Sequence, residues 1–377
     1  MEHLPTSFPR RLVVLLLASL SSIICAEAQT VSNNTDQSWT VTTVVKGPGA
    51  PRRTIEKYSK SGGKTVYEKN EELLGPDGYR PAFYIEKETV QEDATTSRST
   101  EHSYRPDANG RKQLTQVTEE EAKDLPNGES SVVRTTSKPN PEGDLQVVER
   151  EDLETTKSDA ESQATKSTTY RTASAGKTRD NPAPVRQTLE QRKRGDDEHS
   201  ETTKTTKWVD SGNGGLKLAE MSEKVVKEDG ENRTSEEHVW LPDSAGNLSE
   251  VSQTVVKGTQ SHGQNVETAE TYSADVPGKG RDGQLHLVRR VTTVRSGDPD
   301  RTTTEQQVEQ IDAVGQDLKV LTKISDVVTS GPSGSEETKT TRARNPDGTF
   351  SVSSVETSNS DKPPGTEPQS SPSNQPQ

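Results

Sequence analysis

The stretch from Val239 to Val256, Val-Trp-Leu-Pro-Asp-Ser-Ala-Gly-Asn-Leu-Ser-Glu-Val-Ser-Gln-Thr-Val-Val, contains the unit that decides the fold. An aromatic residue closes a polar run, a Pro-Asp turn with a glycine follows, and a segment bearing Leu and Val comes next. Glycine supplies the positive φ that many tight turns require, and aspartate hydrogen-bonds the backbone of its own turn. The unit therefore predicts two strands joined by a short turn.

This unit recurs along most of the chain. Its turn glycines are Gly78, Gly110, Gly143, Gly176, Gly214, Gly246, Gly283, Gly315 and Gly348. Neighbouring glycines are 32 to 38 residues apart, and the two longest separations indicate loop insertions in a tandem array. The aromatic residue stands six positions before the glycine in four units and eleven before it in a fifth: Tyr104, Tyr170, Trp208, Trp240 and Tyr272.

The periodicity of the units is that of strands. A repeat of about 33 residues also fits ankyrin and tetratricopeptide arrays, which are helical. No unit here carries apolar residues at helical spacing, whereas Leu318, Val320, Thr322 and Ile324 alternate with polar residues. Side chains of a strand point to opposite faces with period two, and the Thr and Val of these units suit strands.

The sequence therefore predicts an all-β fold of tandem β-hairpins. Consecutive strands joined by short turns are antiparallel neighbours, so the array is expected to form an extended antiparallel β-meander sheet. Each hairpin needs to contact only its neighbours, as in other repeat arrays. Charged residues and the polar tail are expected to keep the two outer hairpins from further pairing.

Four segments follow from this pattern. Residues 1–28 read as a secretory signal, with Arg10 and Arg11 before an apolar run and a small-residue cleavage site at Ala26-Glu27-Ala28. Residues 29–60 form a degenerate first repeat, residues 61–358 the hairpin array, and residues 359–377 a disordered tail rich in Pro, Ser and Gln. Cys25 is the only cysteine and leaves with the signal, so we expect no disulfide in the mature protein.

Composition limits the core and the partners. Only 25% of the residues are hydrophobic, so a compact globule of this length is excluded, and a largely disordered spacer is the alternative to a thin sheet. The formal net charge of −13 argues against nucleic acid, whose phosphates require a basic face.

No residues suggest catalysis or a cofactor. The sequence has no nucleophile triad, phosphate loop or zinc motif, so we expect no enzyme, no metal and no cofactor. His102 and His238 occupy equivalent repeat positions, but 136 residues separate them, which is too far in a meander for a shared metal.

Two candidate binding features remain. The repeat aromatics Tyr104, Tyr170, Trp208, Trp240 and Tyr272 are candidate stacking platforms, and Arg194-Gly195-Asp196 is a candidate adhesion tripeptide.

The predicted function is that of an exported, non-enzymatic structural protein. It is expected to be secreted, periplasmic or at the cell surface, and to act as an extracellular or envelope-associated scaffold or adhesin-like surface. The alternatives are a carbohydrate- or matrix-binding module that uses the repeat aromatics, and a largely disordered secreted spacer. The expected partner is an extracellular or cell-envelope protein or glycan, with no nucleic acid and no membrane span after signal cleavage.

Overall fold

The computed structural model describes residues 37–361, with the exception of residues 158–160, 172–182, 196–198, 262, 277–282, 299, 312–316 and 332–333. The described residues all belong to one compact unit and form twenty strands and one short 3₁₀ turn, η1 (Pro126–Gly128). The strands are β1 (Gln37–Lys46), β2 (Arg52–Ser61), β3 (Lys64–Gly75), β4 (Gly78–Gln91), β5 (Thr96–Pro106), β6 (Lys112–Asp124), β7 (Ser130–Pro139), β8 (Leu145–Lys157), β9 (Ser162–Arg171), β10 (Pro184–Arg194), β11 (Ser200–Asp210), β12 (Leu216–Asp229), β13 (Asn232–Pro242), β14 (Leu248–Ser261), β15 (Gln264–Ser273), β16 (His286–Gly297), β17 (Arg301–Ile311), β18 (Leu318–Gly331), β19 (Gly334–Arg344) and β20 (Phe350–Ser360).

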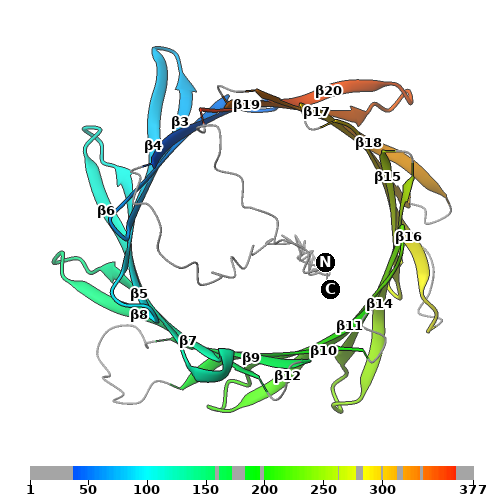
Figure 1. The fold of residues 1–377 in the computed structure, drawn as a ribbon, viewed down its shortest axis with the longest axis horizontal. Helices are drawn as coiled ribbons and strands as arrows, with labels where there is room; N and C mark the ends of the chain where they lie inside the picture. Colours follow the sequence, from blue (N-terminus) through cyan, green and yellow to red (C-terminus); the bar gives the residue numbers. More distant parts are fainter. Residues whose placement is uncertain are drawn as a thin grey trace, which may run out of the picture. The chain divides into compact units, whose positions relative to one another are not determined.

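The strands form a closed antiparallel barrel. Each strand pairs with the next one along the chain, and β1 also pairs with β20, from Val41 opposite Ser360 to Lys46 opposite Val355. The ring is seen end-on in Figure 1. The all-β fold and its hairpin repeats are confirmed, but the prediction of an open, extended meander sheet is wrong.

The composition of the two end strands explains the closure. An unpaired edge presents a row of free backbone groups, which proteins usually block with charges or proline. Strand β20 contains one charged residue, Glu356, and β1 contains one, Lys46, while most of their other residues are Val, Thr and Ser. The charges that were expected to protect the edges are absent from them, so the two edges pair with each other.

Each repeat contributes one irregularity to the ring. The register shifts by one residue or more in nine of the described strand pairs, and each of these pairs is a hairpin that contains one of the nine turn glycines. A β-bulge bends its strand and increases the local twist. Figure 1 shows the ends of hairpins such as β3–β4 and β5–β6 leaning outward from the ring.

The repeat glycines have the backbone conformation that the sequence predicts. Gly110 and Gly246 have φ of 77° and 87°, values that residues with a Cβ rarely adopt. Their backbone N–H groups donate to the carbonyl oxygens of Asp107 and Asp243, three residues earlier. The turns therefore form as predicted wherever the structure describes them.

The barrel is a single layer with little core. Among the described hydrophobic side chains, only Val117 and Val276 are buried, with 6% and 3% exposure. Twenty strands spaced by about 4.8 Å and tilted by about 40° enclose a ring roughly 40 Å across, which side chains cannot fill. Backbone ladders and cross-strand pairs, rather than a hydrophobic interior, hold the ring together.

Parts of the predicted organisation lie outside the described residues. These are the signal peptide, nearly all of the polar tail, Gly176, Gly315 and Asp196. The region predicted to be a degenerate first repeat contains most of the hairpin β1–β2, which has no register shift. Strand β20 extends to Ser360, two residues beyond the predicted end of the array.

Candidate functional site

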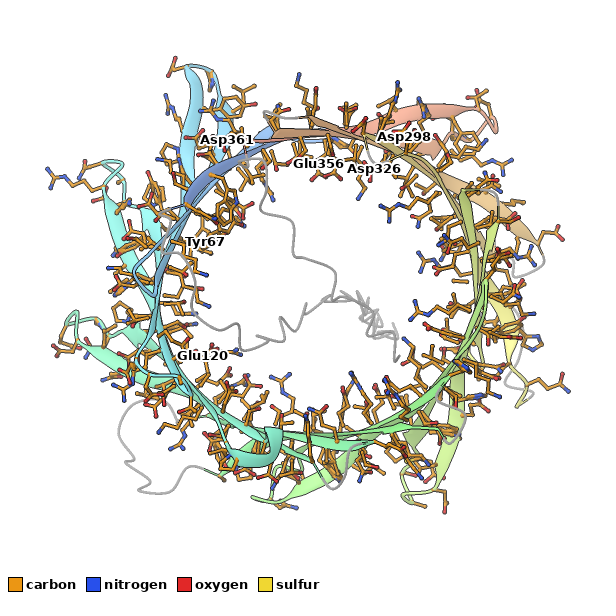
Figure 2. All side chains as sticks on the ribbon, viewed as in Figure 1. Tyr67, Glu120, Asp298, Asp326, Glu356 and Asp361 are labelled. Atoms are coloured by element: carbon orange, nitrogen blue, oxygen red, sulfur yellow. The ribbon has the colours of Figure 1, made fainter. Side chains whose placement is uncertain are left out.

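The lumen of the barrel is the first candidate site. Figure 2 shows Tyr67, Glu120, Asp326 and Glu356 on the inner side of the ring. Residues that face each other in a ladder share a side of the sheet, as do alternate residues of one strand. The inner and outer sides of every strand follow from these four residues and the register of the strand pairs.

The inner wall is polar and charged. Arg134 lies opposite Glu120 on one neighbouring strand and opposite Glu151 on the other. Its guanidinium donates from Nη2 to Glu120 at 2.7 Å and from Nη1 to Glu151 at 2.9 Å. Such a wall favours water over apolar contents.

Charges of both signs line the lumen, and several are paired with each other. The ladder runs from Glu151 through Thr169 to Arg186, so the even-numbered residues of β10 face inward, and Arg192 lies 3.4 Å from Glu190 and 3.5 Å from Glu201. Strand β20 lies ten strands away around the ring, and there Glu356 faces Lys339, which in turn faces Asp326. The width of the ring greatly exceeds the screening length of about 8 Å at physiological ionic strength, so each group of charges acts on solutes close to it.

A stack of three aromatic rings also lines the lumen. Trp39, Tyr58 and Tyr67 face one another across β1, β2 and β3. The centroids of Trp39 and Tyr58 are 5.0 Å apart with the rings 8° from parallel, and Tyr67 follows at a further 5.0 Å. None of these three residues was among the predicted stacking platforms. The alternation of Trp39 with Val41, Thr43 and Val45 was the available signal for a shared face.

The outer wall carries the repeat aromatics. Tyr104 follows inward-facing Ser103, so its ring points out of the barrel, and it sits where the register shifts. Trp208, Trp240 and Tyr272 occupy the same position on β11, β13 and β15, and Tyr170 lies beside the shift on β9. Their cross-strand partners are Leu114, Leu218, Glu250, Leu287 and Pro184. We call these five aromatics and their apolar partners the girdle.

The structure does not bring these aromatics into one pocket. The last four of them stand on alternate strands from β9 to β15, so neighbouring rings there are about 10 Å apart at ordinary strand spacing, and Tyr104 lies four strands earlier, on β5. They occupy the outer wall of the part of the ring from β5 to β15, and their role as ligand-stacking platforms stays a prediction.

The glycine turns lie on one side of the girdle. On its other side, the outer wall of the barrel is charged. Arg290 donates from Nε to Glu270 at 2.8 Å, and His238 lies 2.6 Å from Glu250 through Nδ1 and 3.1 Å from Glu236 through Nε2. The ring of His238 stacks on Trp240 with centroids 5.7 Å apart. Opposite charges thus alternate along this part of the wall.

Neither histidine belongs to a metal site. His238 lies on β13 and His102 on β5, so eight strands separate them along the ring. The described residues include no group of three His, Cys, Asp or Glu side chains placed to hold a metal ion.

The predicted adhesion tripeptide is only partly described. Arg194 ends β10 on the inner face, and its backbone N–H donates to the carbonyl oxygen of Glu161. The backbone N–H of Gly195 donates to Ser200, and Asp196 lies outside the described residues. Its adhesive role stays a prediction.

Aspartates at the turns are fixed by their own backbone. Asp243 Oδ1 accepts hydrogen bonds from the N–H groups of Ala245 at 2.8 Å and Asn247 at 2.9 Å. The Asn247 side chain and these backbone donors hold the pKa of Asp243 below its usual value. Hydrogen bonds to the charged form favour that form, so this turn carries a stable negative charge.

Comparison with known proteins gives similarities of architecture only. No protein-family model matches the chain. No curated protein sequence matches it either. Similar solved structures include OccK9 (OpdG) from Pseudomonas aeruginosa, with 10% identity, a TM-score of 0.47, and coverage of 87% of this chain and 97% of that one. OpdK from Pseudomonas aeruginosa, solved with vanillate, has 7% identity, a TM-score of 0.45, and coverage of 86% and 97%. The FrpB iron transporter from Neisseria meningitidis has 8% identity, a TM-score of 0.44, and coverage of 89% and 75%.

Within the described part of the chain, no helix has the length and apolar character needed to cross a membrane.

The closed ring overturns the predicted function. An extended scaffold or adhesin-like surface is wrong, because the hairpins enclose a lumen instead of forming an open sheet. A carbohydrate- or matrix-binding module built on that sheet is wrong for the same reason. A largely disordered spacer is wrong because twenty paired strands occupy the described residues.

The predicted location and partners are corrected with it. The protein was expected to be secreted, extracellular or periplasmic, with a protein or glycan partner and without a membrane span. The prediction of no membrane span took only transmembrane helices into account, which require a long apolar segment. A closed antiparallel barrel pairs all its backbone groups and leaves no edge, which is the condition for strands to cross a bilayer.

Proposed function

We propose that the chain is a non-enzymatic, water-filled pore for hydrated solutes. The observation that carries this proposal is the pairing of β1 with β20, which closes the sheet around a lumen. Barrels of 16 to 18 strands already leave an aqueous channel, and this ring has twenty strands. A lumen roughly 40 Å across between backbones admits solutes with their hydration shells intact.

The lumen suits polar rather than apolar solutes. Its wall carries paired charges such as Arg134 with Glu120 and Glu151, and Arg192 with Glu190 and Glu201. These groups remain hydrated and interact with charged solutes that pass within a screening length of the wall. The proposed cargo class is therefore charged or polar solutes, with contacts made along the wall.

The girdle is the part of the outer wall suited to lipid. Aromatic rings with a polar edge favour the boundary between lipid headgroups and hydrocarbon. A charged side chain at the centre of a bilayer costs about 2–4 kcal/mol in a barrel, so the charged rows around Arg290 and His238 belong outside the hydrocarbon. We propose that the membrane meets the barrel at the girdle.

Conductance in planar lipid bilayers tests the proposed pore. The purified protein is expected to produce discrete, long-lived current steps that grow with salt concentration. The denatured protein and the buffer are the controls. A preparation with a β-type circular dichroism spectrum that inserts into bilayers but produces no steps would contradict the proposal.

A further inference from the structure

A small cavity of 220 Å³ opens on the outer wall between β2 and β6, away from the lumen. Lys57, Glu68, Tyr84, Glu86 and Lys112 are among the residues that line it. Lys57, Glu68 and Glu86 follow one another across β2, β3 and β4 in a single ladder row. Each is adjacent in sequence to an inward-facing residue, so the row faces outward.

The two carboxylates of this row are incompletely neutralised. Glu68 lies directly opposite Glu86, and like charges in that position destabilise a sheet. Glu86 is matched by Lys112, whose Nζ lies 2.5 Å from its Oε1. Lys57 faces Glu68 from the other side, yet the described residues include no ion pair between them. A second cation between Glu68 and Glu86 would relieve the repulsion.

Contacts hold the ammonium group of Lys112 in place beside the cavity. Lys112 Nζ lies 4.7 Å from the ring centroid of Tyr84 and 5.6 Å from that of Tyr104. An ammonium group over aromatic faces is electrostatically stabilised, and two of its three donors remain after the bond to Glu86. The cavity is therefore lined by two positively charged residues, Lys57 and Lys112, and by two negatively charged ones, Glu68 and Glu86.

A further wall residue needs a hydrogen-bond donor. Asn70 donates from Nδ2 to Glu72 at 2.9 Å, but its Oδ1 is buried and meets no donor in the described part of the chain. A buried acceptor without a donor is unfavourable, and Asn70 is among the residues that line the cavity.

We propose that this cavity binds a small zwitterion that carries a primary ammonium group and an anionic group. The ammonium lies between Glu68 and Glu86, and the anionic group meets Lys57 and Lys112. A phosphoethanolamine group has this chemistry, whether free or as the headgroup of a lipid that reaches the outer wall. Tyr104, a girdle residue, borders the site, which places it at the level of lipid headgroups if the girdle meets a membrane. The inference does not depend on the pore itself.

Titration calorimetry on the folded full chain tests the site with O-phosphoethanolamine as the probe. We expect saturable one-to-one binding and a loss of affinity of about tenfold or more in Glu68→Gln, since a charged hydrogen bond of this kind corresponds to at least one decade in Kd. Glu68 is exposed and forms no hydrogen bond or ion pair with the side chains that the structure describes, so the variant is expected to fold. Glu154→Gln, at an exposed outward position of β8, is the matched control and should bind like the original chain.

Two related probes separate recognition of the zwitterion from general charge effects. Phosphocholine lacks ammonium N–H donors, and ethyl phosphate lacks the cation, so both should bind at least about tenfold more weakly. Equal binding of the three probes, equal binding by Glu68→Gln, or no binding of phosphoethanolamine would each overturn the proposal.

Nanodiscs then identify the source of the zwitterion. Stronger binding to discs that contain phosphatidylethanolamine than to discs of phosphatidylcholine, abolished in Glu68→Gln, assigns the lipid headgroup. Binding of free phosphoethanolamine without any dependence on disc composition supports the site with a soluble ligand instead.

Discussion

Val44 of β1 lies directly opposite Thr357 of β20, across the one strand pair that turns a row of hairpins into a ring. Both side chains face outward, because Val45 and Glu356 beside them face the lumen. Pairs that face each other on one side of an antiparallel ladder contribute roughly 0.2–1 kcal/mol, and like charges there destabilise it.

The first prediction concerns this closing pair. The double variant Val44→Lys with Thr357→Lys places like charges across the seam and should weaken it by about 1 kcal/mol relative to Val44→Lys with Thr357→Glu. Amide hydrogen exchange in β20 should accelerate in the Lys/Lys variant and remain slow in the Lys/Glu variant. Equal exchange in the two variants, at low ionic strength, would contradict the closed ring.

The second prediction concerns charge in the lumen. Arg134→Gln leaves Glu120 and Glu151 without their shared cation, so the reversal potential in a salt gradient should shift toward cation selectivity. The side chain of Arg134 is 47% exposed, so the loss of stability should remain below about 1 kcal/mol. Arg150→Gln is the matched control. Arg150 adjoins Glu151 in sequence and points outward, where it bonds Asp152 at 2.7 Å.

Arg150→Gln should leave selectivity unchanged, because its charge lies outside the permeation path. A shift of similar size in both variants would mean that inner and outer faces are assigned incorrectly.

The repeat pattern predicted the hairpins but not their closure. Turn glycines such as Gly110 and Gly246, and the alternation around Val320, act within one unit, so local physics is enough to predict them. The pairing of β1 with β20 joins residues more than 300 positions apart. It depends on the absence of charge from two particular strands, a signal that the composition of the whole chain hides.

The same contrast explains what was missed at the candidate site. The position of the aromatic residue in each repeat was predicted from its distance to the turn glycine. The β-bulges were not predicted, because a strict alternation of inward and outward residues has no place for an extra residue in a strand. The bulge residues, such as Thr115 between Leu114 and Gln116, set where each hairpin bends. Which face is lumen follows only from the closed ring, so the inward positions of Arg134 and Trp39 were beyond local reasoning.

The third prediction is that removing one whole repeat gives a smaller barrel. Deletion of residues 215–246 removes β12 (Leu216–Asp229) and β13 (Asn232–Pro242) and leaves an even number of strands. The diameter of a barrel grows about linearly with strand number, so an eighteen-strand ring should form with a diameter about one tenth smaller. Single-channel conductance should fall by about one fifth, in proportion to the area of the lumen.

A deletion of residues 231–246 is the matched comparison, because it removes β13 alone and reverses the direction of every later strand. It should not close into a ring. If both deletions behave alike, the hairpin is not the unit of assembly.

The fourth prediction concerns the girdle. Trp208→Ala and Trp240→Ala should leave the circular dichroism spectrum unchanged and weaken partitioning into lipid vesicles by about tenfold each, because the full burial of a large apolar side chain is worth about 1.5–3 kcal/mol. Trp39→Ala removes a tryptophan from the lumen wall and should not affect partitioning. An equal loss of partitioning in all three variants would contradict the assignment of Trp208 and Trp240 to the outer face and of Trp39 to the lumen.

The last prediction concerns the pH response of the turn between β13 and β14. The pKa of Asp243 is lowered by the side chain of Asn247 and by the backbone donors of the turn. A lowered pKa means that the aspartate's contribution to stability is fully present above the ordinary value near 3.9 and is lost as pH falls through the lowered value.

The amide resonance of Asn247 should therefore titrate below pH 3.9 in a two-dimensional NMR spectrum. Asp243→Asn should abolish this titration and keep the turn folded, because the amide oxygen still accepts the backbone bonds. An acid transition of the Asn247 amide that persists in Asp243→Asn would show that the signal arises from another group rather than from Asp243.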